Sequence, residues 1–498
     1  MNVNPITRLD YPDLDVIRVE DTYYMVSTTM HFMPGCEILQ SFDLVHWEHV
    51  TYVYETLDHT DAQQLKSGQN IYGQGMWAAS LRYHEGRFCI CFVANDTRKT
   101  YLYTSEKIDG PWKKQLIEGF YHDGSLLFDE DGRNYIVYGN DEIWITELNE
   151  DLTAPKKDGL HRLLVSDHKN PELGYEGSHI QKINGYYYIF LVHSLRDRWM
   201  RTEACFYSDS LEGEFTGGDV LCDDRGYCGQ GVAQGGIVDT PDGKWYAMLF
   251  QDSGAVGRLP ILLPVTWKDH FPFFGQNGHV PEEIEVHSTR PGYIYQPLVG
   301  SDDFCNGLLP RWQFNHDPDP RYYHLDALQG TYTITTREVC TELTQAVNTL
   351  TQRMSYPSCA AEVTVDASAL KEGDVAGLCA LQSCYAAVGI TKHHGKYEVL
   401  MLDKKEDGIL DMTEGTVVES HQMDFRLEAD FCNMKDEARC YYRVNKGDWL
   451  PIGTVHKLYF KLDHFTGCRF GLFCYAAEET GGSACFRDFK YYDVDEIS

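Results

Sequence analysis

The segment Glu176-Gly-Ser-His-Ile-Gln-Lys-Ile-Asn-Gly185-Tyr-Tyr-Tyr-Ile-Phe-Leu191 reads as two short strands joined by a tight turn. Asn-Gly between β-rich runs is the strongest short-range signal of a β-hairpin. The aromatic run after the turn is typical of a buried strand. The segment therefore predicts a hairpin whose first strand begins with an acidic residue, Glu176.

The same hairpin pattern recurs along the first 298 residues. In the copies that begin at Trp77, Asp123, Glu176 and Gln234 the turn glycine follows nine residues later, and in the copy that begins at Asp13 the turn follows after eight. Successive turns lie 65, 46, 53 and 58 residues apart, which leaves room for about four strands per repeat. The second strands of the five hairpins are Asp21-Thr-Tyr-Tyr-Met-Val-Ser, Gly86-Arg-Phe-Cys-Ile-Cys-Phe, Gly132-Arg-Asn-Tyr-Ile-Val-Tyr, Gly185-Tyr-Tyr-Tyr-Ile-Phe-Leu and Gly243-Lys-Trp-Tyr-Ala-Met-Leu.

A repeat of about four strands is one blade of a β-propeller. Residues 1–298 are therefore predicted to form a five-bladed β-propeller, with one large β-sandwich as the alternative. After Arg290 the repeat ends, and alternating strands such as Tyr397-Glu-Val-Leu-Met-Leu predict a second domain over residues 299–498. We expect that domain to be a two-sheet antiparallel β-sandwich, so the fold class is all-β.

The composition excludes several classes of partner. Asp and Glu number 75 against 43 Lys and Arg, and a net charge of -32 disfavours binding to nucleic acid. No apolar run is long enough to cross a membrane, and the first residues lack the apolar core of a secretion signal. The 16 cysteines include no C-x-x-C pair, so we expect buried free thiols and a cytoplasmic protein without a membrane partner.

The first residues of the five inner strands are the candidate functional residues. Inner strands line the central channel of a propeller, so matching register brings Asp13, Trp77, Asp123, Glu176 and Gln234 around one axis. Paired carboxylates suit glycosidic cleavage, in which one protonates the leaving oxygen and the other activates water. A third carboxylate would tune the acid, and a Trp face would pack on a sugar ring. The alternative interpretations are solvated strand ends for the acids and ordinary packing for Trp77.

Several motifs resemble glycoside hydrolase family 43 and the lectin-like, concanavalin A-like sandwich of its β-xylosidase branch. The motifs are Tyr11-Pro-Asp13, Tyr23-Tyr-Met-Val-Ser-Thr-Thr29, Met76-Trp-Ala78, Asp123-Gly-Ser-Leu126, Glu176-Gly-Ser-His179, Gly257-Arg258, Ser301-Asp-Asp-Phe304, Trp312-Gln-Phe-Asn-His316 and Asn348-Thr-Leu-Thr-Gln-Arg353.

The resemblance implies a catalytic propeller with Asp13 as general base, Glu176 as general acid and Asp123 as pKa modulator. It also implies that Arg258 orients a substrate hydroxyl or the modulator carboxylate, with a surface or structural ion pair as the alternative. By the same resemblance Trp77 and Phe32 would wall the sugar site.

Three positions depart from the family pattern, and at one of them Leu14 replaces the Pro that follows the base. Many members carry a His beside a calcium ion on the fifth inner strand, but this chain has Gln234, which has a weaker claim as a ligand partner. We therefore expect no required cofactor and doubt a central calcium. Position 30, commonly Phe, is Met30, which changes the pocket wall and with it the sugar preference.

The expected activity is an inverting, exo-acting hydrolysis that releases terminal β-1,4-linked xylose from xylo-oligosaccharides. The alternatives are an α-L-arabinofuranosidase, a bifunctional enzyme of both kinds, and a non-catalytic carbohydrate-binding propeller. A retaining fructan-cleaving propeller is disfavoured, because no Arg-Asp-Pro string occurs. The sandwich is expected to act as a lid over the pocket, with sugar binding or a homo-oligomer contact as its other roles.

Overall fold

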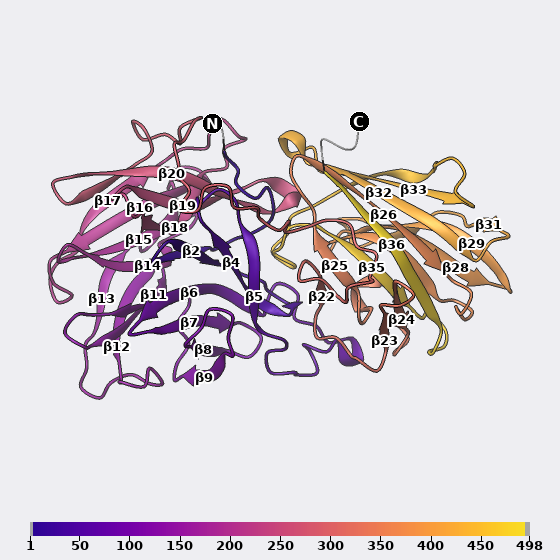
Figure 1. Cartoon of the computed structure of the whole chain (residues 1–498), viewed down its shortest axis with the longest axis horizontal. Coiled ribbons are helices and arrows are strands. Elements are labelled where there is room, and N and C mark those ends of the chain that lie inside the picture. Colours follow the sequence, from indigo (N-terminus) through magenta and orange to yellow (C-terminus); the bar gives the residue numbers. More distant parts are fainter. Residues whose placement is uncertain (1–2, 494–498) are drawn as a thin grey trace.

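The computed structural model describes residues 3–493 of the chain. Nearly all of its regular structure is β, and two bodies lie side by side, the N-terminal one at the left of Figure 1 and the C-terminal one at the right. Short 3₁₀ turns η1 (Lys66–Gly68), η2 (Gly254–Val256), η3 (Leu343–Gln345) and η4 (Cys432–Met434) interrupt the strands. No helix of the described residues is long and apolar enough to span a membrane.

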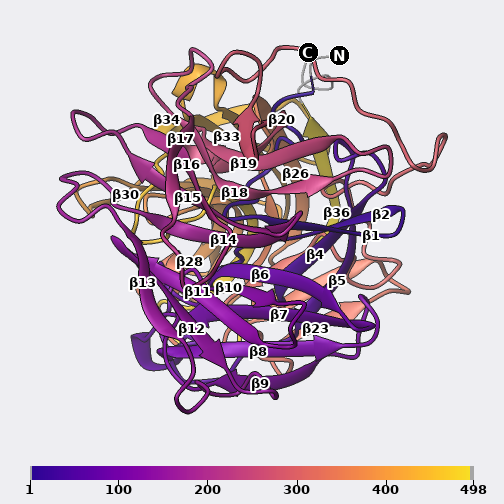
Figure 2. The same cartoon turned by 90° about the vertical axis from the view of Figure 1, so that its left-hand side faces the viewer.

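The N-terminal body is a five-bladed β-propeller, as predicted, and Figure 2 views it with the sandwich behind. Each blade is a four-stranded antiparallel sheet. The blades are β1 (Asp15–Val19), β2 (Thr22–Val26), β4 (Gly35–Ser41), β5 (Glu48–Tyr54); β6 (Met76–His84), β7 (Arg87–Ala94), β8 (Lys99–Ser105), β9 (Lys113–Ile117); β10 (Ser125–Phe128), β11 (Asn134–Asn140), β12 (Glu142–Leu148), β13 (His161–Ser166); β14 (Glu176–Ile183), β15 (Tyr186–Ser194), β16 (Arg201–Ser208), β17 (Thr216–Leu221); and β18 (Val232–Asp239), β19 (Trp245–Asp252), β20 (Arg258–Lys268), β21 (Phe271–Phe274).

The predicted hairpin turns join the first and second strand of each blade. Asn184 and Gly185 have φ angles of 51° and 86°, the left-handed backbone that a two-residue turn between twisted strands requires. The ring closes where β1 contacts both β6 and β18. Apolar side chains of the first and last blades, Val16, Met25, Val238 and Met248 among them, share one buried cluster across this junction.

The C-terminal body is a β-sandwich of two antiparallel sheets. The first contains β22 (Gln313–Asn315), β25 (Leu350–Arg353), β35 (Arg469–Tyr475), β27 (Val375–Leu381), β28 (Ala386–His393), β29 (Lys396–Lys404), β30 (Leu410–Met412) and β31 (Thr416–Val418). The second contains β23 (Tyr323–Asp326), β24 (Thr331–Thr335), β36 (Ser483–Asp493), β26 (Ser358–Asp366), β32 (Gln422–Asp430), β33 (Glu437–Val444) and β34 (Leu450–Lys457). The largest apolar core of the chain lies between them and includes Leu378, Val388, Phe425 and Phe486.

One strand of the N-terminal body joins a sheet of the sandwich. The two-residue strand β3 (Phe32–Met33) pairs with β22, so that Phe314 faces Met33 and Asn315 faces Phe32. The propeller sheets end at Phe274 and those of the sandwich otherwise begin at Gln313, and the boundary between 298 and 299 stays a prediction within that interval. Because the two bodies share a sheet, they are held in one orientation at this seam.

The cysteines form no disulfide, and most of their thiols are buried, as expected. The expectation of burial is wrong for four of them, Cys222, Cys228, Cys305 and Cys432, which are exposed. Burial raises the pKa of the Cys91 thiol to about 12, so this thiol stays protonated and packs as a small apolar group.

A buried ion pair crosses the seam. Arg353 Nη1 on β25 donates to Glu37 Oε2 on β4 over 2.8 Å, and both side chains are almost fully enclosed. Burial opposes ionisation of Glu37, but Arg353 and His49 outweigh it and lower the pKa of Glu37 to about 2. The pair therefore stays charged at neutral pH.

Replacing Arg353 with Met is expected to destabilise the protein by about 3–5 kcal/mol, because Glu37 would remain as a buried charge without this partner. Urea unfolding would measure the loss. The double variant Arg353→Met/Glu37→Gln should recover part of it, and a single variant as stable as the wild type would contradict the expectation.

Candidate active site

Three of the five hub positions adopt a strained backbone. Asp13, Asp123 and Gln234 have φ angles of 51°, 48° and 63°, a left-handed conformation that costs a non-glycine residue about 1–3 kcal/mol. The ladders of β6, β14 and β18 also shift register near their first residues. Such irregularities redirect side chains at a strand end. In this protein these irregularities lie at the hub end of the inner strands, close to Asp13, Asp123 and Glu176.

Asp13 lies just before β1, and its two carboxylate oxygens have separate donors. Thr28 Oγ1 donates to Oδ2 over 2.7 Å, and Arg258 Nη1 donates to Oδ1 over 3.0 Å. Arg258 is 1% exposed, so water screens its attraction to Asp13 only weakly. Of the roles expected for Arg258, orientation of Asp123 is not what this contact shows. The contact is a buried ion pair, the structural alternative, and its partner is the predicted base.

Asp123 and Glu176 come together on neighbouring blades. Each has an oxygen within 4.8 Å of the other and of His122. The backbone N–H of Gly177 donates to Asp123 Oδ2 over 3.1 Å, and Asn140 Nδ2 donates to Glu176 Oε2 over 2.7 Å. Burial, with the charges of Glu176 and Asp13, raises the pKa of Asp123 to about 6, against the opposing effect of His122.

His122 is a site residue that the sequence argument missed, although it stands beside Asp123 in the chain. Its Nε2 is buried, 3.6 Å from Asp123 Oδ2 and 3.5 Å from Glu176 Oε2. The charge of Asp123, followed by Glu176 and Asp13, raises the pKa of His122 to about 9 despite burial. An imidazolium therefore lies between the modulator and the acid at neutral pH.

The raised pKa of His122 makes stability depend on pH. Its stabilising contribution is complete below about pH 6.5 and is lost as the pH rises through about 9. Asp123 titrates below this window. We expect the wild type to lose about 1–3 kcal/mol more stability than His122→Gln between about pH 7 and pH 9.5.

Urea unfolding at the two pH values would measure this difference. His46→Gln, which removes an exposed imidazole, serves as control and should lose stability as the wild type does. Equal losses in the wild type and in His122→Gln would contradict the assignment of a proton to His122.

The hub does not fit a central calcium ion. Gln234 packs on Gly177, where an added Cβ would lie 2.7 Å from Gln234 Cγ. Deeper in the channel Arg82 Nη1 meets Asp15 Oδ2 over 2.7 Å, so a guanidinium already supplies the positive charge there. His122, Asp123 and Glu176 form the one group of described residues with three close ligand atoms, and only two of these residues offer the oxygen ligands that calcium takes six to eight of.

Aromatic side chains of both bodies meet beside the acids. The ring centroid of Trp77 lies 6.2 Å from His122 and 5.5 Å from Phe465. Phe465 belongs to the sandwich, and its ring centroid lies 4.3 Å from Arg258 Cζ, while its carbonyl accepts a hydrogen bond from Arg258 Nη2 over 3.2 Å. The sandwich thus reaches into the hub of the propeller. No local signal in the sequence marks Phe465 for this place.

Phe32 and Met30 lie behind this wall. Phe32 is 2% exposed, and Arg469 Cζ sits 3.5 Å from its ring centroid at the seam. Met30 is 1% exposed, and its backbone pairs with Met76. Neither offers surface to a sugar in this conformation, so substrate contact by either residue stays a prediction.

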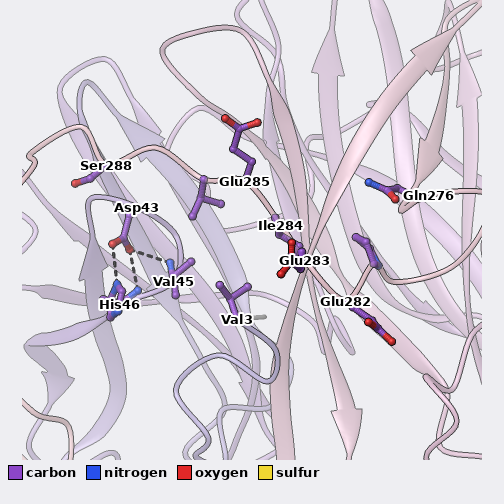
Figure 3. Close-up of a pocket in the computed structure, with 12 residues that line it drawn as sticks. Val3, Asp43, Val45, His46, Gln276, Glu282, Glu283, Ile284, Glu285 and Ser288 are labelled. Carbon is purple, nitrogen blue, oxygen red and sulfur yellow. Dashed lines mark hydrogen bonds and ion pairs between the residues drawn. The ribbon is translucent and has the colours of Figure 1, made fainter. Parts of the chain in front are cut away.

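A large cavity lies away from these acids. It has a volume of about 1000 Å³ and is lined by residues such as Asp43, His46 and Glu283 (Figure 3). The loop that carries Asp43 and His46 joins the ends of β4 and β5 that are remote from Asp13. A second cavity of about 470 Å³, which includes Ile17 and Arg82, opens at that same remote end of the channel. Cavity size therefore does not locate the chemistry in this fold.

A five-bladed propeller with two carboxyl groups and a pKa-shifted third at its hub has the groups that glycosidic cleavage requires. The class this defines is a glycoside hydrolase. A family model described as "Glycosyl hydrolases family 43" matches residues 3–272, and "Beta xylosidase C-terminal Concanavalin A-like domain" matches residues 301–492. The chain belongs to glycosyl hydrolase family 43.

Relatives and solved structures agree with this assignment. A beta-xylosidase of Formosa agariphila is 26% identical, over 99% of this chain and 89% of its own. A xylosidase/arabinosidase of Butyrivibrio fibrisolvens is 23% identical, over 99% of both chains. A bifunctional GH43-CE structure from Bacteroides eggerthii has 42% identity and a TM-score of 0.92, covering 99% of this chain. This chain spans 64% of that longer one.

Proposed function

We propose that the protein is an inverting, exo-acting β-xylosidase that releases terminal xylose from xylo-oligosaccharides. The observation that carries the proposal is the separation of roles at the hub. Asp13 is held by Arg258 and Thr28, whereas Glu176 stands with Asp123 and His122 on other blades. Two carboxyl groups in such different surroundings suit a base and an acid.

In the proposed mechanism Asp13 takes a proton from water on one face of the terminal pentose. Glu176 gives a proton to the departing oxygen on the other face, and the anomeric centre inverts in one displacement. Asn140 occupies Oε2 of Glu176, and no hydrogen bond among the described residues reaches Oε1, which leaves Oε1 for the leaving group. Room for the attacking water requires the two carboxyls to stand about 6.5–9.5 Å apart.

Exo action is supported by a sandwich loop that packs against the hub beside Asp13. Phe465 stacks on Arg258, and its neighbour Gly467 donates its backbone N–H to Asp10 Oδ2 over 2.8 Å. These contacts hold the sandwich loop against the strand end that carries Asp13. A sugar chain that continued past Phe465 would have to displace this loop, so the sandwich is proposed to act as a lid.

The second candidate is hydrolysis of terminal α-L-arabinofuranosides, alone or together with xylosides. Relatives named as xylosidase/arabinosidase and as a non-reducing end α-L-arabinofuranosidase support it. Family membership favours either hydrolase over the non-catalytic sugar-binding alternative. The cytoplasmic location and a homo-oligomer contact through the sandwich stay predictions.

Proton NMR of the first sugar released from an aryl β-D-xyloside tests the stereochemistry. We expect α-xylose to appear first and to mutarotate afterwards, whereas initial β-xylose would refute inversion. Initial rates on p-nitrophenyl β-D-xylopyranoside and α-L-arabinofuranoside then decide the sugar. A tenfold ratio corresponds to only about 1.4 kcal/mol of transition-state preference.

A further inference from the structure

The loop between β15 and β16, residues 195–200, lies at the same end of the fourth blade as Glu176. Glu176 pairs with Val192, only two residues before β15 ends at Ser194. The loop is a tight turn, because Met200 N–H donates to Ser194 Oγ over 2.8 Å and Leu195 N–H donates to the Met200 carbonyl over 3.1 Å. The side chains of this turn are therefore placed near Glu176, the predicted acid.

The turn carries an exposed indole. Trp199 is 44% exposed, and Arg201 Cζ lies 5.4 Å from its ring centroid. A large flat apolar ring with free surface is the group on which the C–H face of a sugar packs. None of the mechanistic roles assigned above uses it.

Arg201 connects this indole to the hub. Arg201 is 7% exposed, and its Nε donates to Asp252 Oδ2 over 2.8 Å. No hydrogen bond among the described residues uses its two Nη atoms, and neither is a buried atom without a partner. They therefore reach accessible space.

Arg201 also lies close to the site. The ring centroid of Phe250 lies 5.3 Å from Arg201 Cζ and 5.5 Å from Arg258 Cζ, so both arginines contact the same ring. Burial lowers the pKa of Arg201, but the charges of Asp252, Glu176 and Asp13 together raise it. The free Nη donors thus lie within the field of both predicted catalytic carboxylates.

We propose that Trp199 and Arg201 form the binding site for the leaving-group sugar, the residue released from the terminal pentose. The inference rests on the proposed function, since the general acid must stand beside the leaving oxygen. Trp199 would pack on the pyranose face, and the Nη atoms of Arg201 would donate to its hydroxyls. The pair would then favour oligosaccharides over glycosides of small alcohols.

The test compares two substrates that share the terminal pentose. Xylobiose has a sugar as leaving group, whereas β-D-xylosyl fluoride has a single atom that cannot touch Trp199. The corresponding disaccharide and fluoride with a terminal arabinose are measured in parallel. Trp199→Ala should lower kcat/KM on the disaccharide about tenfold while changing that on the fluoride less than about twofold. Trp199→Phe should restore most of the loss, because a flat ring returns.

Tyr83→Ala is the matched control. Tyr83 is 45% exposed and lines the cavity at the opposite end of the channel, so both rates should stay within about twofold of the wild type. An unchanged disaccharide-to-fluoride ratio in Trp199→Ala would overturn the inference alone. A wild-type enzyme that hydrolyses neither substrate would overturn the proposed function and the inference with it.

Discussion

Asp13→Ala is expected to lower kcat on aryl xylosides and arabinofuranosides alike, by about 10²- to 10⁴-fold. The reason is that Asp13 has no substitute as base. It is the one carboxylate of the hub that Arg258 and Thr28 orient, whereas Asp123 and Glu176 lie on other blades. Because water must be activated for every leaving group, the loss should not depend on the aglycone. Steady-state rates on two aryl glycosides of different leaving-group pKa would measure it.

Two variants separate this chemical loss from misfolding. Asp13→Asn keeps the size of the side chain and an acceptor for Arg258, so its melting temperature should stay near that of the wild type while activity is lost. Asp21→Ala removes an aspartate from the exposed turn of the same hairpin and should leave activity intact. Retention of more than about a tenth of wild-type kcat in Asp13→Asn would rule out the assigned base.

Glu176→Gln is expected to separate substrates by their leaving groups. Hydrolysis of xylobiose should fall about 10²- to 10⁴-fold, because its sugar alcohol departs only when protonated. Hydrolysis of a dinitrophenyl xyloside should fall far less, since that phenolate leaves without help. Gln is nearly isosteric with Glu and can still accept the hydrogen bond from Asn140.

Comparison of the two kcat/KM values for Glu176→Gln would test this expectation. The variant should also lose the fall in rate at high pH that titration of a general acid produces. Equal losses on both substrates would mean that Glu176 does not act as the proton donor, and the roles of Asp123 and His122 would then have to be reassigned.

Much of the propeller and the acidic trio could be predicted because their signals are local. A hairpin turn such as Asn184-Gly185 depends on the φ angles of two adjacent residues. The number of residues between each turn and the start of its inner strand is nearly constant, which places Glu176, Asp123 and Asp13 at the same end of their blades. Repetition then supplies the circular arrangement. His122 could have been noticed as the neighbour of Asp123, but nothing in its spacing distinguishes it.

The seam between the bodies could not be predicted. The strand that crosses it, β3, is only two residues long, which is too short to show a periodicity. Its partner Phe314 lies some 280 residues away, and the pairing depends on how two finished bodies dock. The same holds for the contact between Phe32 and Arg469, which no local signal in the sequence predicts.

The sequence by itself determined the all-β class, the five hairpins and which three carboxyl groups share one end of the hub, because each of these follows from turn chemistry and counting within a blade. Only the tertiary structure decided that Arg258 pairs with Asp13, that His122 lies between Asp123 and Glu176, and that Phe465 packs on Arg258. These contacts join segments from different blades or bodies. These contacts form only when the chain has folded, and local sequence patterns therefore cannot predict them.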